Sequence, residues 1–325
     1  MVGISRKDDI DQVGIFNDNI TNNTLFIASS RFGTLIKPYR HIINKAYAQI
    51  DVVKGLIQKV QFRNRSFEPL YHFNYWADAA KTVRDSNFSV SEVQFETRIA
   101  PKEKLIQNDN KRQSWGTKGW PVITLRYSLG MKGVLNSDFE YQKIGMQVEQ
   151  NIRLGLLGRL RYTLNAGYIP TALPYPLLES HLGSKSFFYN KYSFNMMKIF
   201  EFVSDQYVSL KLYHKFDGLI SNRIPLFRKL HLRFFATANI LYGKLSQKNV
   251  NLIPLVHSDG TPYAYDENLQ PVPSFHGLGK DPYVEIGYGV SNILRFIRVD
   301  FIHRLTYLQG GAAPFGVRVS TQFEL

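Results

Sequence analysis

The chain has 325 residues, of which 14% are aromatic and 20% are charged, and its formal net charge is +14. It contains no cysteine, which excludes a disulfide scaffold and a cysteine-built zinc or redox site. No stretch approaches the roughly 18 consecutive apolar residues of a membrane-spanning helix, so the sequence excludes a helical membrane protein.

The N-terminal region gives the weakest pattern. Its first residues, MVGISRKDDIDQVGIFNDN, lack the apolar core of a signal peptide, which indicates either a cytoplasmic protein or a piece of a longer chain. We expect residues 1–45 to be a poorly defined leading segment or a first strand, and residues 46–325 to form one domain. The stretch 39–57 can be read as an amphipathic helix or, equally well, as a strand over residues 46–53.

From residue 56 onward, apolar and polar residues alternate in stretch after stretch. Successive side chains of a strand point to opposite faces, so each such stretch predicts a strand. The alternation is strong at 143–154, 158–168, 229–242, 297–307 and 315–325. Weaker copies lie at 56–65, 88–99, 120–128, 200–216 and 282–290. We expect about twelve strands in all, and tight hairpins at RLGLLG and SNILRF.

Each strong stretch has one apolar face and one charged face. In GRLRYTLNAGY, residues 158–168, Arg159 and Arg161 alternate with Leu160 and Tyr162, and Leu232 is expected mid-strand on the apolar face of 229–242. A soluble sheet gives the same pattern with its charged face in water. Three features favour lipid on the apolar face: long strands, tyrosines near strand ends, and an opposite face too charged for a packed core.

Strands in hydrocarbon cannot leave an open edge, so the predicted fold is all-β, an antiparallel transmembrane β-barrel with a watery lumen. Its lumen-facing candidates are the basic and acidic residues at alternate strand positions. They are Arg126, Arg153, Arg159, Arg161, Lys211, Arg233, Arg298, Arg304, Arg318, Glu149, Glu285 and Asp300. These charges form either an inward ion-pair network or an anion-favouring interior. Because they recur singly and form no patch, nucleic-acid binding by a soluble basic β-protein is the least favoured alternative.

The connections between strands are unequal in length. Residues 171–198 and 244–281 form the two longest and fall on one side, whereas short turns fall on the other, as in outer-membrane barrels. The long stretch 101–119 departs from this rule because it falls on the side of the short turns. We expect outer-membrane lipid as a partner, and the loops 171–198 and 244–281 are candidate sites for protein partners.

Residues suited to catalysis or metal binding form no recognisable motif. The eight histidines are scattered, and Asp259, Asp266 and Glu267 lack the spacing of a calcium loop. No GxSxG nucleophile elbow occurs. We therefore expect no catalytic residues, no metal site and no cofactor, and we do not expect an enzyme.

Three long stretches carry a family resemblance. They begin at WPVITLRYSLG, at FEFVSDQYVSL and at PYVEIGYGVSN, and the last runs to the terminal QFEL. From about residue 88 to 325 the chain resembles the C-terminal barrel of a family of uncharacterised Gram-negative outer-membrane proteins. Members of that family carry an N-terminal carboxypeptidase-regulatory-like domain, and their barrel is similar to the BamA/TamA surface-antigen superfamily. The resemblance implies a bacterial outer-membrane location.

The resemblance also sets expectations for single segments. It implies that residues 171–198 correspond to an inward-folding loop, but the Arg-Gly-aromatic tip of that loop is absent here. Phe323 and Leu325 are expected on the lipid face. Superfamily barrels have sixteen strands, so we expect an open barrel with its first edge between residues 24 and 66 and its last at 315–325.

Two functions from different classes follow from these expectations. In the first, the barrel has a transport or membrane-assembly role. In the second, it is a structural or partner-binding barrel whose lumen is closed. The sequence separates the two poorly, because a fold does not determine a function.

Overall fold

The computed structural model describes residues 1–12, 35–108, 111–117, 119–257, 259–265, 268–309 and 311–321. These residues form a 12-stranded sheet in which the strands follow one another in chain order and each neighbouring pair is antiparallel. The strands are β1 (Val2–Gln12), β2 (Pro38–Val53), β3 (Leu56–Pro69), β6 (Phe88–Ile99), β9 (Val122–Gly130), β10 (Tyr141–Arg153), β11 (Arg159–Tyr168), β14 (Gln206–Lys215), β15 (Arg233–Lys244), β16 (Tyr283–Ile293), β17 (Ile297–Arg304) and β18 (Phe315–Thr321). The predicted all-β class and strand number are confirmed.

The remaining elements are short and lie in the connections. The paired strands are β4 (Tyr75–Trp76) with β5 (Arg84–Asp85), β7 (Glu103–Asn108) with β8 (Lys111–Thr117), and β12 (Glu179–Ser180) with β13 (Val203–Ser204). The helical turns are η1 (Val134–Asn136), η2 (Gly155–Leu157), η3 (Tyr175–Leu177), α2 (Pro225–Lys229) and α3 (Gln247–Val250). Within the described residues, none of the helices has the length and apolar character needed to cross a membrane.

Three sequence interpretations need correction or completion. Most of the stretch 39–57 is a strand and not a helix, since β2 runs from Pro38 to Val53. The stretch 229–242 becomes a strand only at Arg233, because Pro225 starts the helix α2 and a turn follows it. Leu232 therefore precedes β15 and is not mid-strand. Of the stretch 200–216, only Gln206 onward joins the large sheet.

The predicted tight hairpins are confirmed. RLGLLG joins β10 to β11, with Arg153 opposite Arg159, and SNILRF joins β16 to β17, with Ile293 opposite Ile297. Gly158 has a φ of 99°, and a Cβ there would lie 2.0 Å from the carbonyl oxygen of Lys215. Only glycine suits this turn, because it accepts a positive φ and leaves room for the neighbouring backbone.

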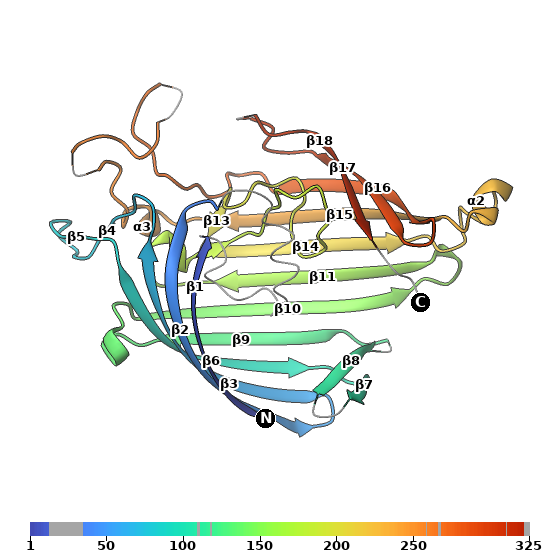
Figure 1. Cartoon of the computed structure of the whole chain (residues 1–325), viewed down its shortest axis with the longest axis horizontal. Coiled ribbons are helices and arrows are strands. Elements are labelled where there is room, and N and C mark those ends of the chain that lie inside the picture. Colours follow the sequence, from blue (N-terminus) through green and yellow to red (C-terminus); the bar gives the residue numbers. More distant parts are fainter. Residues whose placement is uncertain are drawn as a thin grey trace.

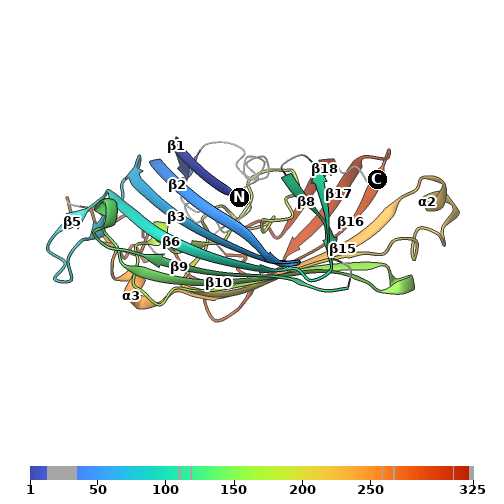
Figure 2. The same ribbon diagram turned by 90° about the horizontal axis from the view of Figure 1, so that it is seen from below.

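The sheet curves into a trough, with β1 along one rim and β18 along the other (Figures 1 and 2). Within the described residues these two strands do not pair, as expected of an open barrel. The first edge is β1, not a segment between residues 24 and 66. The sequence hides this strand because Arg6, Lys7, Asp8 and Asp9 interrupt the alternation, yet β1 pairs with β2 from Val2 opposite Ala48 to Gln12 opposite Pro38.

The register assigns side chains to two faces. Opposed residues on neighbouring strands point the same way, and one row of partners crosses seven strands from β18 to β10. It consists of Arg318, Asp300, Gly289, Phe235, Lys215, Arg159 and Arg153. By alternation from this row, all twelve charged candidates share one face, which we call the inner face because it lies inside the trough. The other face, which carries Leu160, Tyr168 and Ile240, is the outer face.

Candidate functional site

The connection between β11 and β14 lies on the inner face of the sheet. We call residues 169–205 the inner segment; it is drawn in yellow-green inside the trough in Figures 1 and 2. Its ends are joined where the amide of Ile169 donates to the carbonyl oxygen of Asp205 over 2.7 Å, and β12 pairs with β13. Most of the segment is buried, so it packs as part of the interior.

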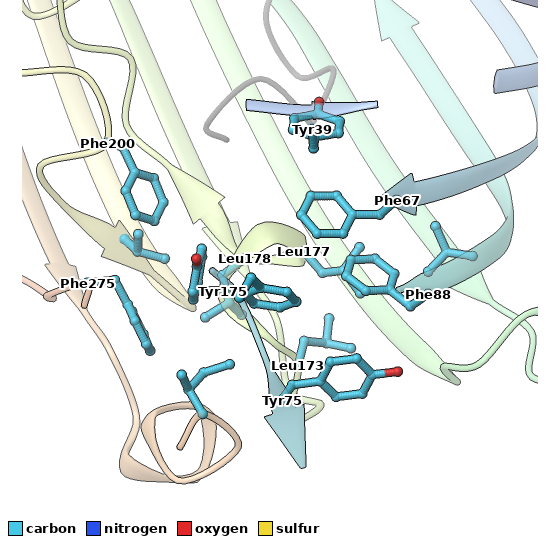
Figure 3. Packing of buried hydrophobic residues seen from close by; sticks show 14 of the residues in the cluster. Tyr39, Phe67, Tyr75, Phe88, Leu173, Tyr175, Leu177, Leu178, Phe200 and Phe275 are labelled. Carbon is cyan, nitrogen blue, oxygen red and sulfur yellow. The ribbon is translucent and has the colours of Figure 1, made fainter. Parts of the chain in front are cut away.

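An apolar cluster holds one end of the inner segment. Tyr175 lies among the rings of Phe73, Phe200 and Phe275, with centroid separations of 4.8–5.2 Å. Figure 3 shows Tyr175 with Phe200 and Phe275. The cluster continues to Phe67 and to other rings at the ends of β2, β3 and β6. The cluster therefore packs the inner segment against the ends of these strands, and its rings are buried.

Glu285 of β16 binds the backbone of the inner segment directly. Its two carboxylate oxygens accept from the amides of Asn195 and Met196, each over 2.9 Å. They also accept from the side chains of Asn239, over 2.8 Å, and Tyr283, over 3.0 Å. The carboxylate is 1% exposed, and four donors satisfy it, which is the condition for burying a charge at tolerable cost.

Two arginines of the last strands contact the same stretch. Arg304 forms an ion pair with Glu201 over 2.6 Å and donates to the carbonyl oxygen of Met196 over 3.3 Å. Arg318 donates to the carbonyl oxygen of Asn195 over 2.8 Å. Residues 195 and 196 thus have their amides bound to β16 and their carbonyl oxygens bound to β17 and β18.

Aromatic and cationic contacts complete this attachment. The guanidinium of Arg298 pairs with Asp300 over 2.6 Å and lies 4.1 Å from the ring centroid of Tyr189. Lys211 donates to the carbonyl oxygen of Tyr192 and lies 4.6 Å from the ring centroid of Phe194. Both arrangements are cation–π contacts. The structure therefore brings half of the predicted charges to one place, namely Lys211, Glu285, Arg298, Asp300, Arg304 and Arg318.

The inner segment also reaches the edge of β18. The amide of Val319 donates to the carbonyl oxygen of Phe187 over 3.0 Å, and the amide of Tyr189 donates to that of Val319 over 3.3 Å. Phe188 and Val319 form a parallel β-bridge. These bonds satisfy backbone groups of an edge strand that has no neighbouring strand beyond it among the described residues.

The other six predicted charges lie on the inner face but away from this attachment. They are more exposed and pair mainly with neighbours on the sheet or in its turns. Arg126 pairs with Glu96, Glu149 accepts from Gln147, Arg161 donates to Asn151, Arg159 pairs with Asp217, Arg233 donates to Ser221, and Arg153 is exposed at its strand end. Their role as lumen-facing groups stays a prediction.

A second buried charge cluster was not singled out from the sequence. Glu92 of β6 forms ion pairs with Arg63 and Arg65 of β3, and the hydroxyl of Tyr141 donates to it over 2.7 Å. Lys143, beside Tyr141 on β10, donates to the carbonyl oxygen of Leu177 over 2.7 Å. The signal was present, because Arg63 and Arg65 alternate along a predicted strand.

Two titratable groups report the burial of the inner segment. His181, 5% exposed, has a ring nitrogen 3.0 Å from the hydroxyl oxygen of Ser204, and burial lowers its pKa to about 3. Lys37 donates to the carbonyl oxygen of Ser274 over 2.7 Å and lies over the rings of Tyr175 and Phe200. Burial lowers the pKa of this ammonium to about 8. Both groups lie in connections.

The loop candidates offer little coordination chemistry. In the part of the chain that the structure describes, no three His, Asp or Glu side chains gather as a metal site would need. Asp259 accepts from the amide and hydroxyl of Thr261, which lowers the pKa of that exposed carboxyl. Asp266, Glu267, Phe323 and Leu325 lie outside the described residues.

Comparison with solved structures finds matches that include the following two proteins. BamA from Haemophilus ducreyi lacking POTRA domains 1–3 is 11% identical, with a TM-score of 0.49 over 88% of this chain and 55% of that chain. CdiB from Acinetobacter baumannii is 8% identical, with a TM-score of 0.39 over 88% of this chain and 51% of that one. The chain thus spans about half the length of either protein.

Comparison of sequences assigns the family. No curated protein matches the chain. Residues 58–250, more than half of the chain and a range that holds the inner segment, match the C-terminal domain of a family of unknown function, DUF5686. The chain belongs to this DUF5686 family.

Proposed function

We propose that the protein is an outer-membrane β-barrel whose lumen is closed at rest by the inner segment. The proposal rests on the two faces of the sheet: the outer face is apolar, with exposed Tyr168 and Tyr242 near strand ends, and the inner face is charged. Such faces suit lipid outside and water inside. The main observation in support of a closed lumen is that Glu285 binds the backbone of the inner segment.

A transport or membrane-assembly role requires that the inner segment moves. Passage of a client through the lumen needs the attachment at residues 189–201 to break, because these residues fill the inner face against β14 to β18. In this scheme the charged side chains of the wall hold a removable plug. The long connection 244–281 and the exposed residues of the inner segment then remain available for protein partners.

Single-channel recording in planar bilayers tests the closed lumen. We expect the wild-type protein to pass almost no current and Glu285→Ala to show long-lived open steps, because the substitution removes the acceptor of two segment amides. Gln147→Arg, on the inner face of β10 and opposite Thr124 and Asn165, neither of which belongs to the attachment, is the matched control and should stay closed. Equal conductance of wild type and Glu285→Ala would contradict the proposal.

Membrane fractionation tests the location separately. We expect the protein to sediment with outer membranes and to dissolve only in detergent. A stable monomer in detergent-free buffer would overturn the barrel interpretation, whatever the conductance shows.

A structural or partner-binding barrel that never opens is the second candidate, favoured by the extent of the buried attachment. Because the chain contains no cysteine, an engineered cysteine pair can distinguish the two candidate functions. Phe188 and Val319 form a parallel β-bridge, and neighbouring strands lie about 4.7–4.9 Å apart, a separation that a disulfide can span. If oxidising the Phe188→Cys/Val319→Cys double variant abolishes activity in cells and reduction restores it, the segment must move. Unchanged activity supports the structural role.

A further inference from the structure

A groove lies on the outer face, across β10, β11, β14 and β15, which are adjacent in Figure 1. Its volume is about 570 Å³, within the range of small-molecule sites. It lies at one end of these strands, where β11 ends at Tyr168, β14 begins at Gln206 and β15 ends at Lys244. The groove therefore opens on the side of the sheet away from the inner segment.

The shape of the groove follows from the register. Met146, Ala166, Val208 and Tyr242 form one row across the four strands, and Ala166 is the smallest of them. Tyr168 stands one pleat nearer the strand end on β11. Because β14 separates β11 from β15, the two tyrosines rise from strands about 9–10 Å apart. They form two walls around a low apolar floor.

The charge of the groove is confined to one end. Lys244 is the one charged residue among those lining it, and it lies in the same row as Gln206, beyond the apolar row. Its ammonium is exposed and forms no ion pair with any residue that the structure describes. An apolar channel that ends in a single available cation is complementary to an amphiphile with a negatively charged head.

We infer that this groove binds an anionic membrane lipid, with one acyl chain between Tyr168 and Tyr242 and its phosphate at Lys244. The inference rests on the proposed membrane location and adds a specific lipid site to it. A helix of a partner protein is about 10–12 Å wide with its side chains, too wide to reach a floor between walls that rise from strands about 9–10 Å apart. A single acyl chain fits this width.

Photo-crosslinking in lipid nanodiscs tests the inference. The probes are phosphatidylglycerol and phosphatidylcholine that carry the same photoactivatable acyl chain, and mass spectrometry maps the labelled residues. We expect labels to concentrate at Met146, Val208 and Tyr242, with phosphatidylglycerol favoured about fivefold, the ratio expected for one lysine near a membrane surface. Lys244→Glu should remove this preference.

Matched tryptophan variants separate the groove from the rest of the outer face. Ala166→Trp fills the floor and should lower labelling of the groove about fivefold or more, whereas Ala236→Trp, on the same face near the opposite end, should not. If the labels are distributed evenly over the outer face and Ala166→Trp does not change them, the lipid site is overturned but the barrel interpretation is not. No label anywhere on that face would overturn the barrel itself. A dimer that Ala166→Trp abolishes would assign the groove to a second copy of the chain.

Discussion

Two parts of the inner face carry the same sequence pattern and differ in what their charges do. At β14 to β18 the charges lie beneath the inner segment: Glu285, Arg298 and Arg304 are at most 6% exposed and bind its backbone or its rings. Toward the β10–β11 hairpin, Arg159 and its partner Asp217 are 52% and 36% exposed. Burial therefore decides whether a charged side chain of the inner face holds a neighbouring segment in place or only lies on a solvated surface.

The largest effect should come from the buried part. Glu285→Ala leaves four donors without an acceptor, and removing one partner of a buried charged network costs about 3–5 kcal/mol. We expect urea unfolding in detergent micelles to shift accordingly, and amide exchange to accelerate within residues 189–201. Glu285→Gln, which retains one acceptor oxygen, should fall between wild type and Glu285→Ala. Unchanged exchange of Asn195 and Met196 in Glu285→Ala would show that the carboxylate does not hold the segment.

The outer face provides the next effect and tests the assignment of the two faces. Ile240 lies mid-strand on β15, opposite Leu210, and an arginine there should cost roughly 2–4 kcal/mol if it meets the membrane interior. Folding yield into lipid vesicles measures this. The matched control is Gln147→Arg on the inner face of β10, where the new cation lies beside Glu149, the present partner of Gln147. Thr237 is a poor control, because it is 7% exposed and packs against Gly287. Equal cost at residues 240 and 147 would contradict the assignment of the two faces.

The free energy of unfolding should depend on pH, and we expect the largest single contribution to this dependence to come from a group of the inner segment. The folded protein keeps His181 neutral, with a pKa of about 3, whereas the unfolded chain protonates it below about 6.5. Stability from this group is thus complete above about pH 6.5 and is lost as the pH falls, by about 2 kcal/mol at pH 5. His181→Gln should flatten this slope in urea unfolding measured from pH 7 to 5, with the exposed His231→Gln as control. An unchanged slope would mean that His181 is solvated.

The smallest effect is expected in the exposed part of the inner face. Arg159 pairs with Asp217 over 2.7 Å, and this pairing lowers the pKa of the Asp217 carboxyl. Because both side chains are well exposed, solvent screens the pair, and Arg159→Ala should cost less than about 1 kcal/mol. The variant for comparison is Arg304→Ala in the buried part, which removes the ion-pair partner of Glu201. If both variants lose the same stability in urea unfolding, burial is not what separates the two parts.

The alternation of residues determined much of the fold by itself. Period-two patterns are local, so Leu160 and Tyr162 against Arg159 and Arg161 suffice to assign a strand and its two faces. The same logic placed all twelve charged candidates on one face. It failed where local signals compete: consecutive charges mask β1, and the helix α2 shortens the expected strand at Leu232.

Only the tertiary structure decided which of those charges become a site. The inner segment has no period, and its attachments join residues far apart in the chain, such as Arg304 to Glu201 and Arg318 to Asn195, which are 103 and 123 positions apart. Such contacts depend on the curvature of the whole sheet and on the fold of the segment. Arg159 and Arg298 therefore have the same sequence pattern, although water screens the first and the second is buried beneath Tyr189. The pattern cannot separate them, because solvent exposure is a property of the assembled molecule.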